Sequence, residues 1–215
     1  MPQPIHHAAL GCRSHSGWAA LVALSGPLDS PEVVDRRRIE IADAAIRGSK
    51  QPFHAAEPMP SPTAEAFLKR CTGRTTDLAI EALRNAVAEL RARGYQATSF
   101  GITLGSGRAL PELKAVLASH ALIHTAEGEF YRDGLLRAAK SCRLNVSGIK
   151  EKELYEQASA RLRIPLSELG RRVADLGKPL GPPWSQDQKY AALAAWLALS
   201  GADTASAEQN GPKKR

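Results

Sequence analysis

The sequence predicts an α/β protein in which helices cover both faces of a mixed five-stranded sheet, built from three antiparallel strands followed by parallel additions. Three segments typical of strands follow one another near the amino end, with only short or turn-rich linkers between them, and the third carries a run of arginines. Farther along the chain, helical periodicity alternates with short apolar runs. A closing segment is apolar on nearly all sides, which is typical of a helix packed against a sheet. A run of adjacent strands followed by alternating units indicates a mixed sheet.

Residues 7–12, 17–24 and 32–41 are expected to form the three antiparallel strands. The second is almost entirely apolar, as a central strand covered on both faces would be. The turn-rich linker 25–31 favours a hairpin over a crossover helix. Residues 47–74 begin with a proline-rich stretch, and we expect them to form an exposed loop.

Helices and strands should alternate through the rest of the chain. The first long helix is expected to open at Thr75 or Thr76 as caps, to carry Asp77 in its first turn, and to stop at Gly94. The elements expected after it are a strand at 97–107, helices at 111–118 and 124–142, a strand at 144–149, and helices at 150–162, 166–177 and 185–201. Residues 1–200 would form a single domain, followed by a disordered basic tail at 201–215.

The composition limits the classes of protein to consider. With 215 residues and 43% apolar content, the chain can fill a substantial core. Its formal charge of +7 suits a polyanionic partner such as nucleic acid, although a basic surface alone does not establish one. Cys12, Cys71 and Cys142 lack paired spacing, which fits a reducing cytoplasm. No signal peptide and no apolar run of about 18 residues is present, so we expect a cytoplasmic protein without a membrane partner.

Three segments carry a resemblance to a known family: "LGCRSHSGWAAL" near the start, "EFYRDGLLRAAKSCRLNVSGIKEKEL", and "DQKYAALAAWLAL" near the end. Together with the element order over about residues 8–200, they resemble the RNase H-like superfamily and, within it, the RuvC-type Holliday-junction resolvases. The resemblance implies an RNase H-like fold and a branched-DNA partner. It also implies a nuclease centre in which three or four carboxylates hold two Mg²⁺ or Mn²⁺ ions.

The acids that the family would supply are mostly replaced in this chain. The opening aspartate falls at Arg13, and no acid stands at 103–105, where the fourth strand would provide one. In the closing helix Asp187 matches the first acid of a pair, Tyr190 replaces the second, and Lys189 lies between them. The resemblance therefore predicts a resolvase-like protein whose standard two-metal centre is degenerate.

A different set of groups would have to support any cleavage. Asp187 with Glu127 or Glu129 would supply the acids, and His15 is the candidate base. Both glutamates also suit the solvated first turn of a helix, where acids complement the helix dipole.

A second metal arrangement is also suggested by spacing. His120, His124 and Glu127 fall at i, i+4 and i+7, which would place them on one face of a continuous helix. The metal ligands predicted from sequence are His120 and His124, from this spacing, and Asp187, from the resemblance described above. Chance helical spacing is the competing interpretation.

The opening turn offers donors for an anion. It lies at the end of a strand, where open α/β sheets usually bind ligands, and a glycine turn at 104–111 would lie beside it. An ordinary strand-to-helix turn explains the same glycines. The side chains assigned to nucleic-acid or anion binding are those of Arg13, Ser14, Ser16, Arg108 and Lys189.

Arginine runs at 36–38 and 171–172 would contact phosphates or simply form solvated faces. Trp184 would stack on a base or fasten the closing helix to the core.

The function predicted is nucleic-acid binding, with structured or branched DNA as the partner and a homodimer as the assembly. One alternative is an enzyme or sensor that binds a small anionic metabolite between the turns at 13–17 and 104–108. Another is a structural subunit that assembles through the closing helix. Steep salt dependence of binding would favour nucleic acid over a small anion.

Overall fold

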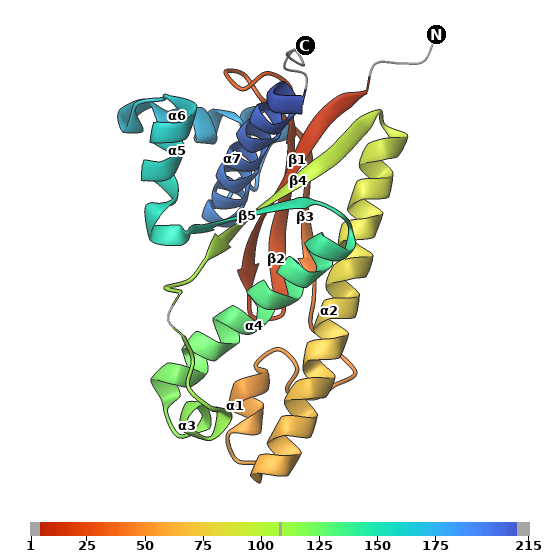
Figure 1. Cartoon of the computed structure of the whole chain (residues 1–215), viewed down its shortest axis with the longest axis vertical. Helices are drawn as coiled ribbons and strands as arrows, with labels where there is room; N and C mark the ends of the chain where they lie inside the picture. Colours follow the sequence, from red (N-terminus) through yellow and green to blue (C-terminus); the bar gives the residue numbers. More distant parts are fainter. Residues whose placement is uncertain (1–4, 108, 210–215) are drawn as a thin grey trace, which may run out of the picture.

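The computed structural model describes residues 5–107 and 109–209, the last eight as helix backbone only. A five-stranded sheet forms its centre (Figure 1). The strands β1 (His6–His15), β2 (Trp18–Ser25) and β3 (Glu32–Glu40) pair antiparallel, whereas β4 (Tyr95–Leu104) and β5 (Asn145–Lys150) are added parallel to β1. The order β3-β2-β1-β4-β5 confirms the predicted mixed sheet.

Helices cover both faces of the sheet, as predicted. The long helices α2 (Ser61–Ala92) and α4 (His120–Ser141) lie on one face, and α7 (Gln186–Gln209) lies on the other (Figure 1). Outside α7 pack α5 (Leu154–Leu162) and α6 (Leu166–Asp175). The shorter elements are α1 (Pro52–Ala56), α3 (Leu113–Leu117) and the 3₁₀ turns Glu151–Glu153 and Lys178–Leu180.

The alternation of β2 between two buried faces explains its continuous apolar run. Val22 and Leu24 belong to the core on the α7 side, whereas Leu21 and Ala23 belong to the core on the α2 and α4 side. All four side chains are fully buried. The prediction of a central strand covered on both faces is confirmed.

Two glycines let α7 lie unusually close to the sheet. A methyl group on Gly11 would stand 1.9 Å from the carbonyl oxygen of Ala191, and one on Gly101 would stand 2.1 Å from that of Ala194. Neighbouring strands therefore present bare backbone to a helix face made of alanine. This close approach fixes the start of α7, and hence Asp187, relative to β1 and β4.

The prediction of an exposed loop over 47–74 is wrong. Instead, α1 begins at Pro52 and α2 begins at Ser61. Pro52 and Pro62 stand in the first turns of these helices, where a backbone N–H has no intrahelical partner and proline is well tolerated. The prolines begin helices here rather than excluding them.

The predicted caps of the first long helix consequently lie inside it. Thr75 is buried in the middle of α2, and the Thr76 hydroxyl donates a hydrogen bond to the Thr72 carbonyl oxygen at 2.8 Å. Asp77 is also an interior position, 3.9 Å from Arg74. The actual start of α2 lies about four turns earlier.

The amino-terminal halves of α2 and α4 project beyond the sheet and carry α1 and α3 with them (Figure 1). A small separate core fastens this projection, centred on Ala56, Ala64, Phe67, Leu68 and Cys71.

The carboxyl-terminal helix continues past residue 200 to Gln209. The first part of the tail that was predicted to be disordered is therefore helical, which suits its alanine content. The rest of that tail, 210–215, lies outside the described residues. Within the described ranges, no helix combines the length and apolarity needed to cross a bilayer.

Candidate functional site

The carboxyl ends of β1 and β4 meet at one edge of the sheet. These strands are adjacent and parallel, with Cys12 opposite Ile102, so residues 13–15 lie level with residues 103–105. Glu151 follows directly after β5, and Asp187 stands in the first turn of α7. The topology therefore brings four distant parts of the chain to one place, which we call the strand-edge site.

The turn between β1 and β2 is shorter than the predicted donor-rich loop at 13–17. Arg13, Ser14 and His15 are strand residues that pair with β2, and only Ser16 and Gly17 form the connection. Gly17 has a φ of 85° and Ser16 does not have a positive φ, which is the pattern of a type II turn with glycine at its second central position. The side chains of Arg13 and His15 are consequently fixed by the sheet and not carried on a loop.

Arg13 forms the centre of the strand-edge site. Its Nε and Nη2 atoms donate to the two carboxylate oxygens of Glu151 at 3.0 and 2.7 Å, and its Nη1 donates to Asp187 Oδ1. The guanidinium also lies 4.8 Å from the ring centroid of Tyr190. Burial opposes the charged form, but the bonds to both carboxylates outweigh it and raise the pKa of Arg13 above its usual value. A permanent cation therefore bridges the two acids.

His15 is held in the same network. Its Nε2 lies 2.8 Å from Asp187 Oδ1, and its ring stacks on Trp18 with centroids 4.4 Å apart. The Arg38 guanidinium lies over Trp18, 4.0 Å from the ring centroid. The Nε2 nitrogen of His15 is therefore engaged with a carboxylate, which leaves Nδ1 as the nitrogen that a general base would use.

An acid does reach the end of β4, although it comes from a helix. Glu129 on α4 pairs with Arg132 at 3.1 Å, and a methyl group on Gly105 would stand 2.5 Å from Glu129 Oε1 and 2.7 Å from Arg132 Nη1. The Glu129 carboxylate thus lies where the resemblance expects an acid from the fourth strand. It too is paired with an arginine.

These residues do not fit a two-metal nuclease centre. Such a centre needs several carboxylates that face bound cations. Glu151 and Asp187 instead face the Arg13 guanidinium, and Glu129 faces Arg132. Arginine groups supply the positive charge that Mg²⁺ or Mn²⁺ would supply.

Glu127 lies away from this network, in the interface between α4 and α1. Its carboxylate is buried and accepts hydrogen bonds from the backbone N–H groups of Phe53 and His54 at 2.8 and 3.1 Å. Burial raises the pKa of Glu127 above its usual value, against the opposing effect of these bonds. The structure brings Glu127 together with His54, and not with Asp187 as the catalytic prediction had paired it.

The predicted metal ligands also lie at two different places in the structure. His120 and His124 lie on one continuous helix, as their spacing indicated, and His54 joins them as a third member. Asp187 is instead part of the strand-edge site.

The first arginine run makes contacts within the protein. Arg36 donates to the Gly181 carbonyl oxygen at 3.0 Å, and Arg37 pairs with Asp35 and Glu89 at 2.6 and 2.7 Å. The run therefore ties β3 to the segment before α7 and to α2.

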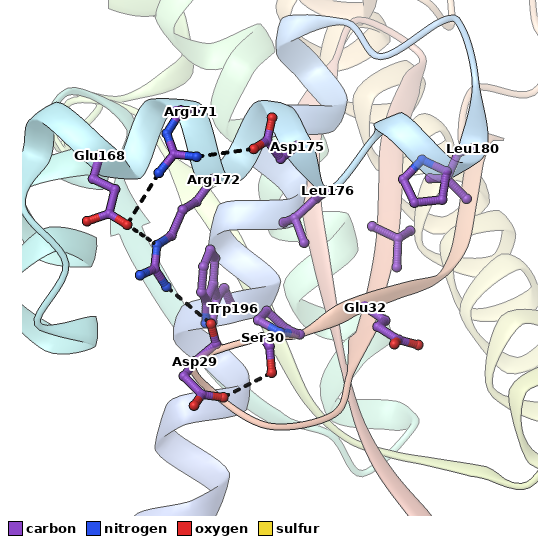
Figure 2. A pocket seen from close by; sticks show the side chains of 13 residues that line it. Asp29, Ser30, Glu32, Glu168, Arg171, Arg172, Asp175, Leu176, Leu180 and Trp196 are labelled. Atoms are coloured by element: carbon purple, nitrogen blue, oxygen red, sulfur yellow. Dashed lines mark hydrogen bonds and ion pairs between the residues drawn. The ribbon is translucent and has the colours of Figure 1, made fainter.

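The second run lines a cavity of about 660 Å³ near the β2–β3 linker (Figure 2). Arg172 pairs with Glu168 at 2.8 Å and donates to the Asp29 carbonyl oxygen at 3.1 Å, and Arg171 pairs with Glu168 and Asp175. Four acids and two arginines line this cavity, so it has no preference for an anion. It lies at a different place from the strand-edge site.

Trp184 is half-buried and packs against the core on the α7 side of the sheet. Its indole nitrogen donates to the Val173 carbonyl oxygen at 3.0 Å, and a methyl group on Gly177 would stand 2.2 Å from its ring. Trp184 therefore fastens the start of α7 and is not free to stack on a base.

The remaining predicted binding residues surround the site only loosely. Ser14 is a half-buried strand residue, Ser16 is exposed in the turn, and Lys189 is half-buried in the first turn of α7. Arg108 lies outside the described residues.

Sequence reasoning missed Glu151, the stacking of Trp18, and His54. Glu151 lies two residues after the strand predicted at 144–149, which was the one available signal.

Comparison with known proteins gives a result at the level of fold. No family model and no curated protein matches the sequence. Among solved structures, Thermus thermophilus RuvC in complex with Holliday junction substrate matches with a TM-score of 0.52 and 12% identity, over 93% of this chain and 96% of that one. A second structure of Thermus thermophilus RuvC matches with a TM-score of 0.52 and 11% identity, over 92% and 96%. This chain has a RuvC-like RNase H fold.

Proposed function

We propose that this protein binds branched DNA and that Arg13 replaces the metal ions of the resolvase centre, so that it does not cleave DNA by two-metal catalysis. One observation carries the proposal: a guanidinium lies between the Glu151 and Asp187 carboxylates at the strand-edge site. The likeness to a RuvC structure described as bound to a Holliday junction substrate, over nearly the whole chain, supports the choice of partner.

An arginine can perform the electrostatic part of the metal's work. Carboxylates that face a phosphate backbone repel it unless a cation compensates them, and a planar guanidinium does so through bidentate hydrogen bonds. The Arg13 guanidinium compensates these carboxylates whatever the concentration of divalent cation. It supplies neither an activated water nor coordination of a leaving oxygen, which are the catalytic contributions of a metal.

Basic side chains near the strand-edge site would contact phosphates. Lys50 lies against the β1–β2 turn, with its Cγ 3.2 Å from a methyl position on Gly17, and it is exposed. Lys150 ends β5, next to Glu151, and lies near Gly107. With the overall charge of +7, these groups favour a polyanion over a neutral ligand.

Fluorescence anisotropy with four-way-junction, duplex and single-stranded DNA, across a salt series, tests the proposal. We expect tightest binding to the junction, a steep loss of affinity with salt, and equal affinity in Mg²⁺ and in EDTA. The double variant Lys50→Glu, Lys150→Glu should bind the junction at least about tenfold more weakly at low salt. Lys140→Glu is the matched control, because Lys140 is exposed near the carboxyl end of α4, which leads to the opposite edge of the sheet.

Equal and weak binding to all three DNAs, unaffected by the lysine variants, would contradict the proposal. The alternative function, binding of a small anion between residues 13–17 and 104–108, would then be tested with inorganic phosphate by calorimetry. That alternative requires Arg13 to leave two carboxylates, which is why we place it second.

A further inference from the structure

Three histidine rings converge between α1 and the start of α4, away from the strand-edge site. His120 and His124 lie one helical turn apart, with their Nε2 atoms 3.0 Å from each other. The His54 ring lies across from both, with centroid distances of 5.5 Å to His120 and 4.8 Å to His124. One ring nitrogen from each residue lies within 4.8 Å of the other two.

The separation of two of these nitrogens is close to what one small cation requires. Zinc binds imidazole nitrogen at about 2.0–2.1 Å, so that two ligands of a tetrahedral ion lie about 3.3 Å apart. The His120 and His124 nitrogens are already close to that separation, and the His54 nitrogen, which lies within 4.8 Å of both, would move closer to complete the set. Two neutral imidazoles share one hydrogen bond at best in this position, whereas a metal ion would use a lone pair from every ring.

Glu127 orients the third ring. Its Oε1 atom lies 3.2 Å from His54 Nδ1 and also accepts both backbone N–H bonds at the start of α1. A hydrogen on His54 Nδ1 leaves the Nε2 lone pair available. A carboxylate that holds the far nitrogen of a ligating histidine is the usual outer shell of such sites.

The Glu127 side chain is itself buried and incompletely satisfied. It is 4% exposed, and its second oxygen, Oε2, has no hydrogen-bond partner among the residues that the structure describes. A buried carboxylate is costly unless a positive charge compensates it. A metal ion on His54 would bring such a charge close to Glu127.

We propose that His54, His120 and His124 bind one transition-metal ion of the zinc class, with Glu127 as the outer-shell carboxylate and a fourth coordination position open to solvent. His120 and His124 are exposed, so an ion reaches them without unfolding. The sequence had suggested Glu127 as a ligand beside the two histidines of α4; His54 takes that position instead. The site fastens α1 to α4 and does not depend on the proposed DNA binding.

Titration of EDTA-stripped protein with Co²⁺ and Zn²⁺ tests this inference. We expect one equivalent of Co²⁺ to produce visible d–d absorption without a thiolate charge-transfer band, since Cys71 is not a ligand. Zn²⁺ should displace the Co²⁺ and raise the melting temperature, whereas Mg²⁺ should do neither, because nitrogen ligands discriminate against it.

Variants assign the signal to residues. His54→Gln and His124→Gln should each lower the affinity at least about tenfold, and Glu127→Gln should do so by about ten- to a hundredfold. The double variant His6→Gln, His7→Gln removes an exposed histidine pair at the start of β1 and should bind like the wild type.

The stripped His124→Gln variant should melt like the stripped wild type because His124 is exposed. Absence of one-equivalent binding, full retention of binding in His124→Gln, or its loss in the His6, His7 variant would each overturn the inference.

Discussion

The charge of the strand-edge site depends on Arg13. A guanidinium at this position reverses the charge that an aspartate would bring, and two carboxylates compensate it. The sequence itself shows Arg13 and Tyr190 at two positions where the resemblance implies acids. It did not reveal the pairing with Glu151, because that contact spans 138 residues and depends on strand order.

Replacing Arg13 by methionine should therefore destabilise the protein. The change leaves Glu151 and Asp187 close together without a cation, and we expect the free energy of unfolding to fall by about 1–3 kcal/mol. Adding Asp187→Asn should recover part of this loss, which a double-mutant cycle by urea denaturation would measure.

Arg137→Met is the control for that cycle. Its exposed pair with Asp133 is 3.6 Å long and should contribute no more than about 0.5 kcal/mol. Equal losses of unfolding free energy in Arg13→Met and Arg137→Met would contradict a stabilising role for the bridge that Arg13 makes between the two carboxylates.

The cysteines give a second expectation at this scale. Burial raises the pKa of the Cys12 thiol well above its usual range, and it also raises that of Cys142, which is only half-buried. Alkylation of the native protein, followed by mass spectrometry, should label Cys142 before Cys12. Early labelling of Cys12 would contradict its place in the central core.

At the scale of elements, hydrophobic periodicity predicted the strands and most helices. However, the interpretation of the prolines within 47–74 as evidence for a loop is wrong. A helix interior excludes proline, whereas a first turn accepts it, and composition alone does not separate the two cases. Pro52 and Pro62 are of the second kind, so a predicted loop is two helices. His54 was missed for the same reason, since it lies on the unpredicted helix.

The fit between α7 and the sheet can be tested at two glycines. Gly101→Ala would put a methyl group 2.1 Å from the Ala194 carbonyl oxygen, and we expect a loss of about 3 kcal/mol or more in unfolding free energy. Gly73→Ala, on the exposed side of α2 with open space around it, should instead stabilise by about 0.5–1 kcal/mol. Calorimetric melting of both variants measures the difference, and a tolerated alanine at 101 would contradict the close approach.

The burial of α7 limits the surfaces through which two copies of the chain could assemble. The apolar residues of α7 from Ala191 to Leu199 are buried within one chain by the sheet and by α5. A homodimer remains a prediction, and this helix does not supply an open apolar face for it between those residues. Sedimentation over a range of concentrations would determine the oligomeric state.

For the whole molecule, a fold shared with RuvC persists at 12% identity because the pattern of buried positions, and not the residues themselves, specifies it. The element order was therefore predictable from periodicity, while the chemistry at the strand edge had to come from coordinates.

Incubation of the wild-type protein with a labelled four-way junction in Mg²⁺ or Mn²⁺, followed by denaturing gel electrophoresis, tests whether the strand-edge site lacks two-metal catalysis. We expect an intact junction at protein concentrations that saturate binding. Metal-dependent cleavage that disappears in Asp187→Asn would contradict it, because the carboxylates would then hold catalytic metal despite Arg13.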